Sequence, residues 1–365
     1  MFNLTFNKIM LFLVFFLGYT NVVSANSDSC KLPDMQNSGL NVTLNTSCIY
    51  HGELKITKSG THLNCQGATL DGGNIHRVGI LVTGKGKKIS DVKIINCKII
   101  NYLNSGIRIT NGIKAQELSE EHDLNYSRSP EKITLTNIKI SNSGRVAVFF
   151  DSYTTNSIIE DSEIDGSGGP AIYLEHSSQK IEVLKNFIIN NADTNNRQSG
   201  SAGIHIDSSA NNLIKDNYFS DNKAGGVFLY KNCSEKFSNG KSVIRWQHSD
   251  YNTIINNIFS EEEVGVWIAA RQSKNLSKWD CGDSSMDGKN KFYEDFANNN
   301  LIKNNKFCNN KISVRIEGDN NEILGNSYNS TPETFVQFPE SMREKIIGKP
   351  VIGNKVEKNT FKKCD

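Results

Sequence analysis

The chain has 365 residues, 22% charged and 37% hydrophobic, a balance that excludes an intrinsically disordered chain and a protein with many membrane spans. Its formal net charge of +2 argues against nucleic-acid binding, because proteins that neutralise phosphates carry a clear basic excess. The length fits either two globular domains or one elongated repeat domain.

The first 25 residues have the pattern of a secretory signal peptide. Lys8 precedes an apolar run over residues 9–18, and Val23, Ser24 and Ala25 form a small-residue cleavage site. A membrane anchor is the weaker alternative, because the run is shorter than the ~20 residues that cross a bilayer. We therefore expect an exported protein, secreted or periplasmic, with no membrane span after cleavage.

Two kinds of short strand alternate from about residue 63 to the end of the chain. One kind is mostly opened by glycine, as in 106–109, 203–206, 226–229 and 265–268; strands of similar pattern are 171–174 and 313–316. The other kind is rich in asparagine, as in 211–219, 251–259, 299–307 and 320–328.

The spacing of these strands indicates a solenoid. Asn300 and Asn321 are 21 residues apart, and Gly203 and Gly226 are 23 apart. Short strands with period-two alternation and no helical stripe favour a parallel β-helix over a leucine-rich repeat. Each coil then buries its Ile, Val, Leu and Phe side chains against the next coil. Asparagines at equivalent turns are expected to stack into hydrogen-bonded ladders.

The glycine-opened and asparagine-rich strands resemble the PbH1 repeats of the pectate-lyase-like superfamily over about residues 60–330. The resemblance implies an all-β, single right-handed parallel β-helix. It does not determine the activity, because the superfamily contains lyases, hydrolases, epimerases and binding proteins. The expected organisation is a signal peptide over 1–25, an N-terminal cap over 26–60, the β-helix over 61–330 and a C-terminal cap over 331–365.

Eight cysteines in an exported chain predict disulfides, and their spacing does not fit a zinc site. Eight cysteines allow 105 pairings. Cys65 and Cys97 occupy equivalent positions on neighbouring coils, and Cys364 can anchor the last segment to Cys308. We therefore expect neighbours in sequence order to pair: Cys30 with Cys48, Cys65 with Cys97, Cys233 with Cys281, and Cys308 with Cys364.

If the glycine-opened strands stack in register, their outward side chains form columns on one face. The first column is unusual because four successive coils present an aromatic or imidazole ring. The alternative is that loops 111–130, 232–250 and 272–298 cover these rings as a second core. The first column comprises Arg108, Tyr173, His205, Phe228, Trp267 and Arg315, and the second comprises Glu175, Asp207, Tyr230, Ala269 and Glu317.

Two long insertions leave the same edge of adjacent coils, beside these columns. The first, 233–250, contains Arg245 and Trp246, and the second is 273–298. Functional groups concentrate on loops that a rigid scaffold holds, so the insertions support a groove. Because ring faces are good platforms for sugars, we expect this groove to bind an acidic polysaccharide through Tyr173, Glu175, His176, Asp207, Phe228, Trp267, Arg245, Trp246 and Arg315.

Lyases and epimerases of uronate sugars need a base, an acid and a group that neutralises the carboxylate. Lys231 and Arg271 end neighbouring strands, which resembles the lysine-base, arginine-acid arrangement of the β-helical alginate lyases and chondroitinase B. Lys231 is the expected base, with Tyr230 or Arg271 as acid or neutraliser and His205 beside them. A lysine acts as a base when its pKa is lowered, which a nearby arginine promotes.

The sequence departs from these families in several places. The acidic calcium ligands that precede the lysine in the lyases are replaced here by Phe228 and Tyr230. Glu175 and Asp207 are the remaining calcium candidates, with hydrogen bonds to histidine or lysine as their alternative role. The Asp-Pro-His motif of mannuronan epimerases is absent, although His205, Ile206 and Asp207 loosely resemble it.

The sequence therefore predicts an exported lyase or epimerase of a uronate-containing glycan. The alternative is a non-catalytic glycan-binding or export-scaffold protein that uses the same groove.

Overall fold

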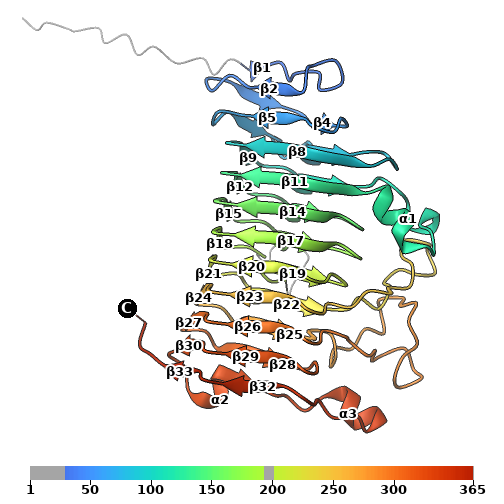
Figure 1. Cartoon of the computed structure of the whole chain (residues 1–365), viewed down its shortest axis with the longest axis vertical. Coiled ribbons are helices and arrows are strands. Elements are labelled where there is room, and N and C mark those ends of the chain that lie inside the picture. Colours follow the sequence, from blue (N-terminus) through green and yellow to red (C-terminus); the bar gives the residue numbers. More distant parts are fainter. Residues whose placement is uncertain (1–28, 193–200, 365) are drawn as a thin grey trace, which may run out of the picture.

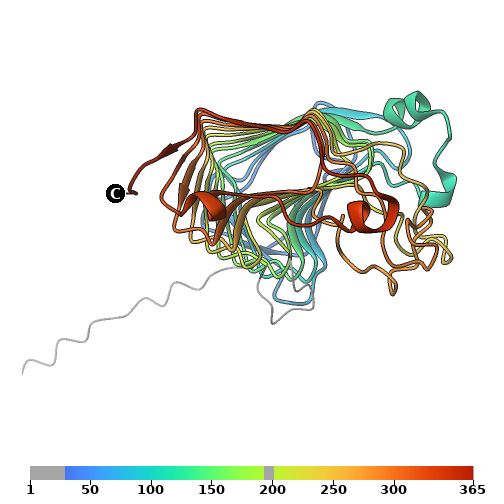
Figure 2. The ribbon, with the colours of Figure 1, turned by 90° about the horizontal axis from the view of Figure 1, so that it is seen from below.

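The computed structural model describes residues 29–192 and 201–364, which wind into one tall coil of parallel strands (Figure 1). The strands stack into three parallel sheets of 12, 11 and 10 strands, here called sheets A, B and C. Seen from one end, successive coils superimpose around a shared interior (Figure 2). This confirms the predicted parallel β-helix. The predicted signal peptide, 1–25, lies outside the described residues.

Each sheet takes one strand from each coil. Sheet A contains β1 (Ser29–Cys30), β3 (Ile49–His51), β6 (Thr69–Asp71), β9 (Lys98–Ile100), β12 (Lys139–Ser141), β15 (Glu163–Asp165), β18 (Phe187–Ile189), β21 (Tyr218–Ser220), β24 (Ile258–Ser260), β27 (Lys306–Cys308), β30 (Ser327–Tyr328) and β33 (Thr360–Phe361). Sheet B contains β2 (Asn41–Thr43), β5 (His62–Asn64), β8 (Ile89–Ile95), β11 (Pro130–Thr136), β14 (Thr155–Glu160), β17 (Gln179–Leu184), β20 (Leu213–Lys215), β23 (Thr253–Ile255), β26 (Leu301–Lys303), β29 (Glu322–Leu324) and β32 (Lys355–Glu357). Sheet C contains β4 (Leu54–Ile56), β7 (Val78–Thr83), β10 (Ser105–Thr110), β13 (Val146–Phe150), β16 (Ile172–Leu174), β19 (Ile204–Asp207), β22 (Val227–Tyr230), β25 (Val264–Ile268), β28 (Ile312–Ile316) and β31 (Val336–Gln337).

Helical segments are few and short: η1 (Ala115–Glu117), α1 (His122–Ser127), α2 (Pro332–Phe335) and α3 (Met342–Ile347). In the described part of the chain, no helix is long and apolar enough to span a membrane. The strand ladders extend beyond the expected range of 61–330, from β1 at one end to β33 at the other. The segments expected as caps therefore also contribute strands to the coils.

Asparagines form the predicted ladders where strands of sheet B turn into sheet A. The Asn217 amide donates to Asn257 Oδ1 at 2.9 Å, and Asn257 donates to Asn305 Oδ1 at 3.0 Å. The residue before Asn217, Asp216, has a φ of 57°, a left-handed conformation that Asp and Asn tolerate better than most residues. Stacked amides thus satisfy the polar groups that each tight turn buries.

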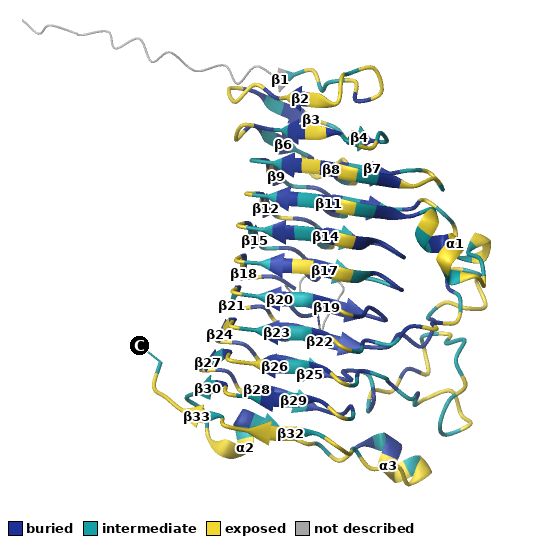
Figure 3. Cartoon of the chain, in the orientation of Figure 1, coloured by how far each residue is buried: buried dark blue, intermediate teal, exposed yellow. Residues whose placement is uncertain are grey.

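The interior is one continuous hydrophobic core, which runs along the whole coil (Figure 3). In sheet A, Phe259 stacks on Phe219 at 4.7 Å and on Phe307 at 5.1 Å between ring centroids. A Cβ at Gly226 would lie 2.5 Å from the Phe259 ring, so the glycine before β22 makes room for this stack. The glycine-opened pattern therefore reflects packing against sheet A.

Four disulfides join the cysteines in the predicted order. Cys65–Cys97 links neighbouring coils inside the core, whereas Cys233–Cys281 links two protruding loops. No free cysteine is present among the described residues. Disulfides persist in oxidising surroundings, which points to the cell exterior or the periplasm.

The insertions gather along one edge of the coil, as both ribbon views show (Figures 1 and 2). The segment that carries α1 contacts the loop between β22 and β23: the His122 and Trp246 rings stack at 4.3 Å. Tyr126 also donates a hydrogen bond to the Ser177 carbonyl at 2.8 Å. These contacts make a wall beside the outward face of sheet C.

Candidate functional site

The outward column on sheet C is in the predicted register. Tyr173 pairs with His205, His205 with Phe228, Phe228 with Trp267, and Trp267 with Arg315. The column has one further member that was not predicted: Phe149 of β13 lies between Arg108 and Tyr173. The inward residues predicted for these strands are fully buried in the core.

The part of the column from Tyr173 to Arg315 lines a pocket of about 650 Å³, here called the aromatic pocket. The loops do cover part of it, since His205 is 8%, Phe228 4% and Tyr230 2% exposed. The loops therefore bury part of the ring column, and the remaining surface of these rings lines the pocket. The lining comprises Pro170, Tyr173, Ser201, His205, Ala224, Phe228, Tyr230, Glu235, Trp267, Ala270, Arg271, Ser273, Lys274, Trp279 and Arg315.

A directed chain of hydrogen bonds runs along one wall of the aromatic pocket. The His205 Nε2 accepts the Ala202 N–H at 3.0 Å, so the ring proton lies on Nδ1, which donates to Tyr230 Oη at 3.0 Å. Tyr230 then donates to Tyr173 Oη at 3.1 Å, and Tyr173 donates to Asp207 Oδ2 at 2.6 Å. The chain therefore points from the imidazole to a buried carboxylate.

Burial sets the protonation of these groups. It lowers the pKa of His205 to about 3, assisted by the charges of Arg271 and Lys274, so the imidazole is neutral at pH 7. Burial also raises the pKa values of Tyr173 and Tyr230 above the usual phenol value, and nearby Asp207 acts in the same direction. Both phenols therefore hold their protons at neutral pH.

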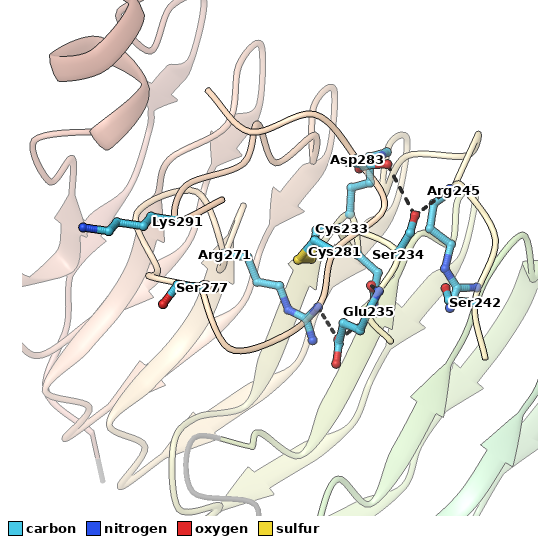
Figure 4. Close-up of a disulfide and its surroundings, with 12 residues drawn as sticks. Cys233, Ser234, Glu235, Ser242, Arg245, Arg271, Ser277, Cys281, Asp283 and Lys291 are labelled. Atoms are coloured by element: carbon cyan, nitrogen blue, oxygen red, sulfur yellow. Dashed lines mark hydrogen bonds and ion pairs between the residues drawn. A yellow bond between two sulfur atoms is a disulfide. The ribbon is translucent and has the colours of Figure 1, made fainter. Parts of the chain in front are cut away.

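Arg271 is clamped at the rim of the aromatic pocket. Its guanidinium carbon lies 4.0 Å from the Tyr230 ring centroid and 4.6 Å from the Trp279 ring centroid. Its Nη1 pairs with Glu235 Oε1 at 2.6 Å (Figure 4). The loop that bears Glu235 is joined by Cys233–Cys281 to the segment that bears Trp279. A planar cation held this way is suited to bidentate recognition of a carboxylate.

Lys274 lines the same pocket, with its amine 5.2 Å from the Trp279 ring centroid. Partial burial lowers its pKa, and the positive charge of Arg271 lowers it further. This is the effect that the sequence analysis expected of Lys231. The lowered pKa belongs instead to Lys274, which was not among the predicted site residues.

Lys231 does not share a pocket with Arg271, contrary to the predicted arrangement. Its amine forms an ion pair with Asp283, and it lines a separate hollow that also contains Phe296. Its backbone N–H is held by Asp295 Oδ1 at 2.5 Å. Strand alternation ends at Tyr230, so the loop contacts, and no longer the sheet, set the direction of this side chain.

The remaining predicted residues divide between a second pocket and the exterior. Glu175, His176 and Arg245 line a pocket of about 560 Å³, here called the basic pocket. Trp246 lines neither pocket and stacks on His122. The basic pocket is walled by the segment after β10 and by the loop after β22, and its charged side chains are Arg108, Lys114, Lys241, Arg245, Asp151 and Glu175.

The calcium candidates are occupied by protein contacts. Asp207 Oδ2 accepts from Tyr173 and, at 3.1 Å, from the Asn232 amide. Burial raises the pKa of Glu175 to about 8, and the neighbouring Asp151 adds to the effect, so Glu175 is a poor cation ligand at pH 7. Across 29–192 and 201–364, no group of three or more His, Cys, Asp or Glu side chains is arranged to hold a metal ion.

A family model described as "Right handed beta helix region" matches residues 78–242. The chain is a right-handed parallel β-helix protein. A second model, "Periplasmic copper-binding protein (NosD)", matches residues 190–353 of this β-helix protein. No match was found among curated proteins.

Solved structures share the fold at low identity. The A-module of the mannuronan C-5 epimerase AlgE6 from Azotobacter vinelandii is 13% identical, with a TM-score of 0.51, over 89% of this β-helix protein and 84% of that chain. The catalytic unit of a GH87 α-1,3-glucanase from Streptomyces thermodiastaticus is 11% identical, with a TM-score of 0.52, over 89% and 61%. An alginate lyase from Paenibacillus is 11% identical, with a TM-score of 0.49, over 89% and 94%.

Copper, which the second family description names, does not fit the side chains of this β-helix protein. Copper sites use cysteine, methionine and histidine ligands brought together. All eight cysteines form disulfides, and the described residues contain no group of three His, Cys, Asp or Glu side chains that could hold a metal ion.

Proposed function

We propose that the protein is a lyase or epimerase that acts on a uronate-containing polysaccharide in the aromatic pocket. The observation that carries this proposal is the clamped Arg271 beside an amine of lowered pKa, Lys274, and two protonated phenols, Tyr173 and Tyr230. Neutraliser, base and acid, the three groups that the reaction needs, thus line one pocket. The mannuronan epimerase and the glucanase that share the fold also act on polysaccharides.

Each group has a separate part in the proposed reaction. Arg271 binds the uronate carboxylate and so makes the hydrogen on the adjacent carbon more acidic. Lys274 removes that proton. In a lyase, the electron pair forms a carbon–carbon double bond as the bond to the glycosidic oxygen breaks, and a phenol gives the oxygen its proton. In an epimerase, the phenol returns a proton to the opposite face of the same carbon.

The hydrogen-bond chain fixes the positions of the two phenol rings. His205 and Asp207 do not need to touch the substrate, because they hold Tyr230 and Tyr173 in fixed orientations. Tyr173, Phe228 and Trp267 supply ring faces against which a sugar chain can lie. Among the charged residues of the lining, Arg271, Lys274 and Arg315 outnumber Glu235, which favours an anionic chain.

The proposal is tested with purified protein against alginate, pectate and glycosaminoglycans. A lyase produces an unsaturated uronate, which absorbs ultraviolet light, and an epimerase exchanges hydrogen with heavy water. Lys274→Ala should lower turnover by roughly 10²-fold or more with little change in binding, since a positioned base contributes about 10²–10⁴-fold. Turnover by the wild type should also rise with pH, because Lys274 must lose its proton.

Lys278→Ala is the matched control, because Lys278 is an exposed lysine of the same loop outside the pocket lining. It should behave as the wild type. Binding without turnover or exchange by the wild type across the panel would contradict catalysis and favour the alternative, a glycan-binding protein. In that case Trp267→Ala should weaken binding.

A further inference from the structure

The basic pocket lies on the same outward face of sheet C as the aromatic pocket, nearer the N-terminal end of the coil. Arg108 of β10 belongs to the same column as Tyr173, and Phe150 of β13 pairs with Leu174 of β16. Asp151 and Glu175, which follow this pair, therefore lie on neighbouring coils. Arg108, Asp151 and Glu175 have no part in the reaction proposed above.

Positive charge exceeds negative charge in this pocket. Arg108 Nη2 is paired with Asp151 Oδ2 at 2.6 Å. Arg245 Nη2 lies 3.4 Å from Glu175 Oε1, but the raised pKa of Glu175 leaves that carboxyl mostly uncharged at pH 7. Among the described residues, no carboxylate lies within ion-pair distance of Lys241. The pocket therefore holds cations without anionic partners.

Two buried side chains of this pocket have hydrogen-bonding capacity that the described protein leaves unused. His176 is 2% and Arg245 is 8% exposed. The His176 Nε2 and the Arg245 Nε each lack a hydrogen-bond partner among the described residues. Buried polar atoms are nearly always paired in folded proteins, so these two unpaired nitrogens show that the protein alone does not satisfy all polar groups around the pocket.

We propose that the basic pocket is a second binding site, which takes an anionic group, a carboxylate or a sulfate ester, of an acidic glycan. The guanidinium of Arg245 and the amine of Lys241 face the anion, and Glu175, as a neutral acid, can donate to it. The glycan part of this proposal rests on the proposed function, whereas anion binding by the pocket does not.

The two pockets are far enough apart that one sugar cannot reach both. Glu175 directly follows β16, and Phe228 lies in β22, two strands further along sheet C; neighbouring strands are about 4.8 Å apart, so the separation along the axis is about 10 Å. A monosaccharide therefore fills one pocket at a time. Affinity should increase sharply with chain length once both pockets are filled together.

Sulfate is the first probe, and the thermal midpoint of unfolding is the readout. At constant ionic strength, replacing chloride by sulfate should raise the midpoint of the wild type in a saturable way. Lys241→Glu should lose at least half of this shift. Lys236→Glu, an exposed lysine of the same loop outside the pocket, makes the same change of charge and should keep the shift. If sulfate shifts the thermal midpoint of both variants equally, the proposed anion site is wrong.

A second experiment tests whether the bound anion belongs to an acidic glycan or is a free ion. Acidic oligosaccharides of increasing length are titrated calorimetrically with and without sulfate. Sulfate should weaken the binding of long chains at least several-fold in the wild type and in Lys236→Glu, and much less in Lys241→Glu. If sulfate binds at this pocket but competes with no acidic chain, the glycan assignment is overturned and the ligand is a free anion. That result is distinct from a failure of the proposed function, which the turnover of Lys274→Ala tests.

Discussion

At the scale of single residues, Glu262 stands where an asparagine ladder would carry another asparagine. Its Oε1 accepts from the Asn222 amide at 2.7 Å, and its Oε2 is buried without a partner among the described residues. Burial raises the pKa of this carboxyl to about 8. Since an unfolded glutamate ionises near pH 4.5, folded-state stability should fall as pH rises from about 4.5 to about 8 and then level off.

Glu262→Gln removes this titration while an amide oxygen still accepts from Asn222. The free energy of unfolding should change little at pH 5 and should increase at pH 8 by on the order of 4 kcal/mol, since the rise in pKa from 4.5 to about 8 corresponds to about 1.36 kcal/mol for each pKa unit. Denaturant unfolding at the two pH values measures this. Glu182→Gln, at an exposed position of β17, is the control and should show no such pH-dependent gain. A gain of equal size at pH 5 would contradict the explanation.

Residue positions on strands were predictable, whereas positions just beyond strand ends were not. Tyr173, His205, Phe228 and Trp267 lie where period-two alternation puts them, because ladder pairing fixes their direction. Lys231 follows the last residue of β22, and its direction comes from Asp283, about fifty residues further along. No local pattern carries that information.

At the scale of elements, the Cys233–Cys281 disulfide holds the loops that position Arg271. Cys233 packs with Leu276 and Tyr293 in a small cluster separate from the main core. Replacing both cysteines by serine should loosen these loops and leave the coil intact. We expect faster proteolysis within 231–300, a loss of turnover or binding, and a small change in the thermal midpoint.

The pair Cys65 and Cys97 gives the contrasting control, because that disulfide lies inside the main core. Its double serine variant should lower the free energy of unfolding by about 2–5 kcal/mol without selective proteolysis of the 231–300 loops. Limited proteolysis and thermal unfolding of both variants measure the difference. A large loss of global stability in the Cys233 and Cys281 variant would show that the loops support the coil.

The elements themselves were predictable where the repeat was regular. The strands opened by Gly203, Gly226 and Gly265 are found as expected, because a larger residue there would meet side chains of sheet A. These side chains are Ile188, Phe259 and Phe307, respectively. The strand β13, which Arg145 precedes in place of glycine, was not predicted. Because β13 was not predicted, Asp151, which follows it, was not recognised as a neighbour of Glu175. The charge of Asp151 helps to raise the pKa of Glu175.

At the scale of the whole molecule, each coil is stabilised mainly by its two neighbours. The phenylalanine stack of sheet A is one such link, since Phe259 lies between Phe219 and Phe307. Phe259→Ala should lower the free energy of unfolding by about 3–5 kcal/mol. The loss should be local at first, because a solenoid can open around one weakened interface while distant coils stay folded.

Hydrogen exchange followed by mass spectrometry tests this local opening. Amides of β21, β24 and β27 should lose protection in Phe259→Ala, whereas those of β6, β9 and β12 should keep it. Phe187→Ala removes an exposed phenylalanine from the same sheet and should leave both regions protected. Uniform loss of protection along the coil would instead indicate that the molecule unfolds as one cooperative unit. Local opening would break the aromatic pocket, whose rings come from β16 to β25, before the basic pocket, whose walls include β7 and β10.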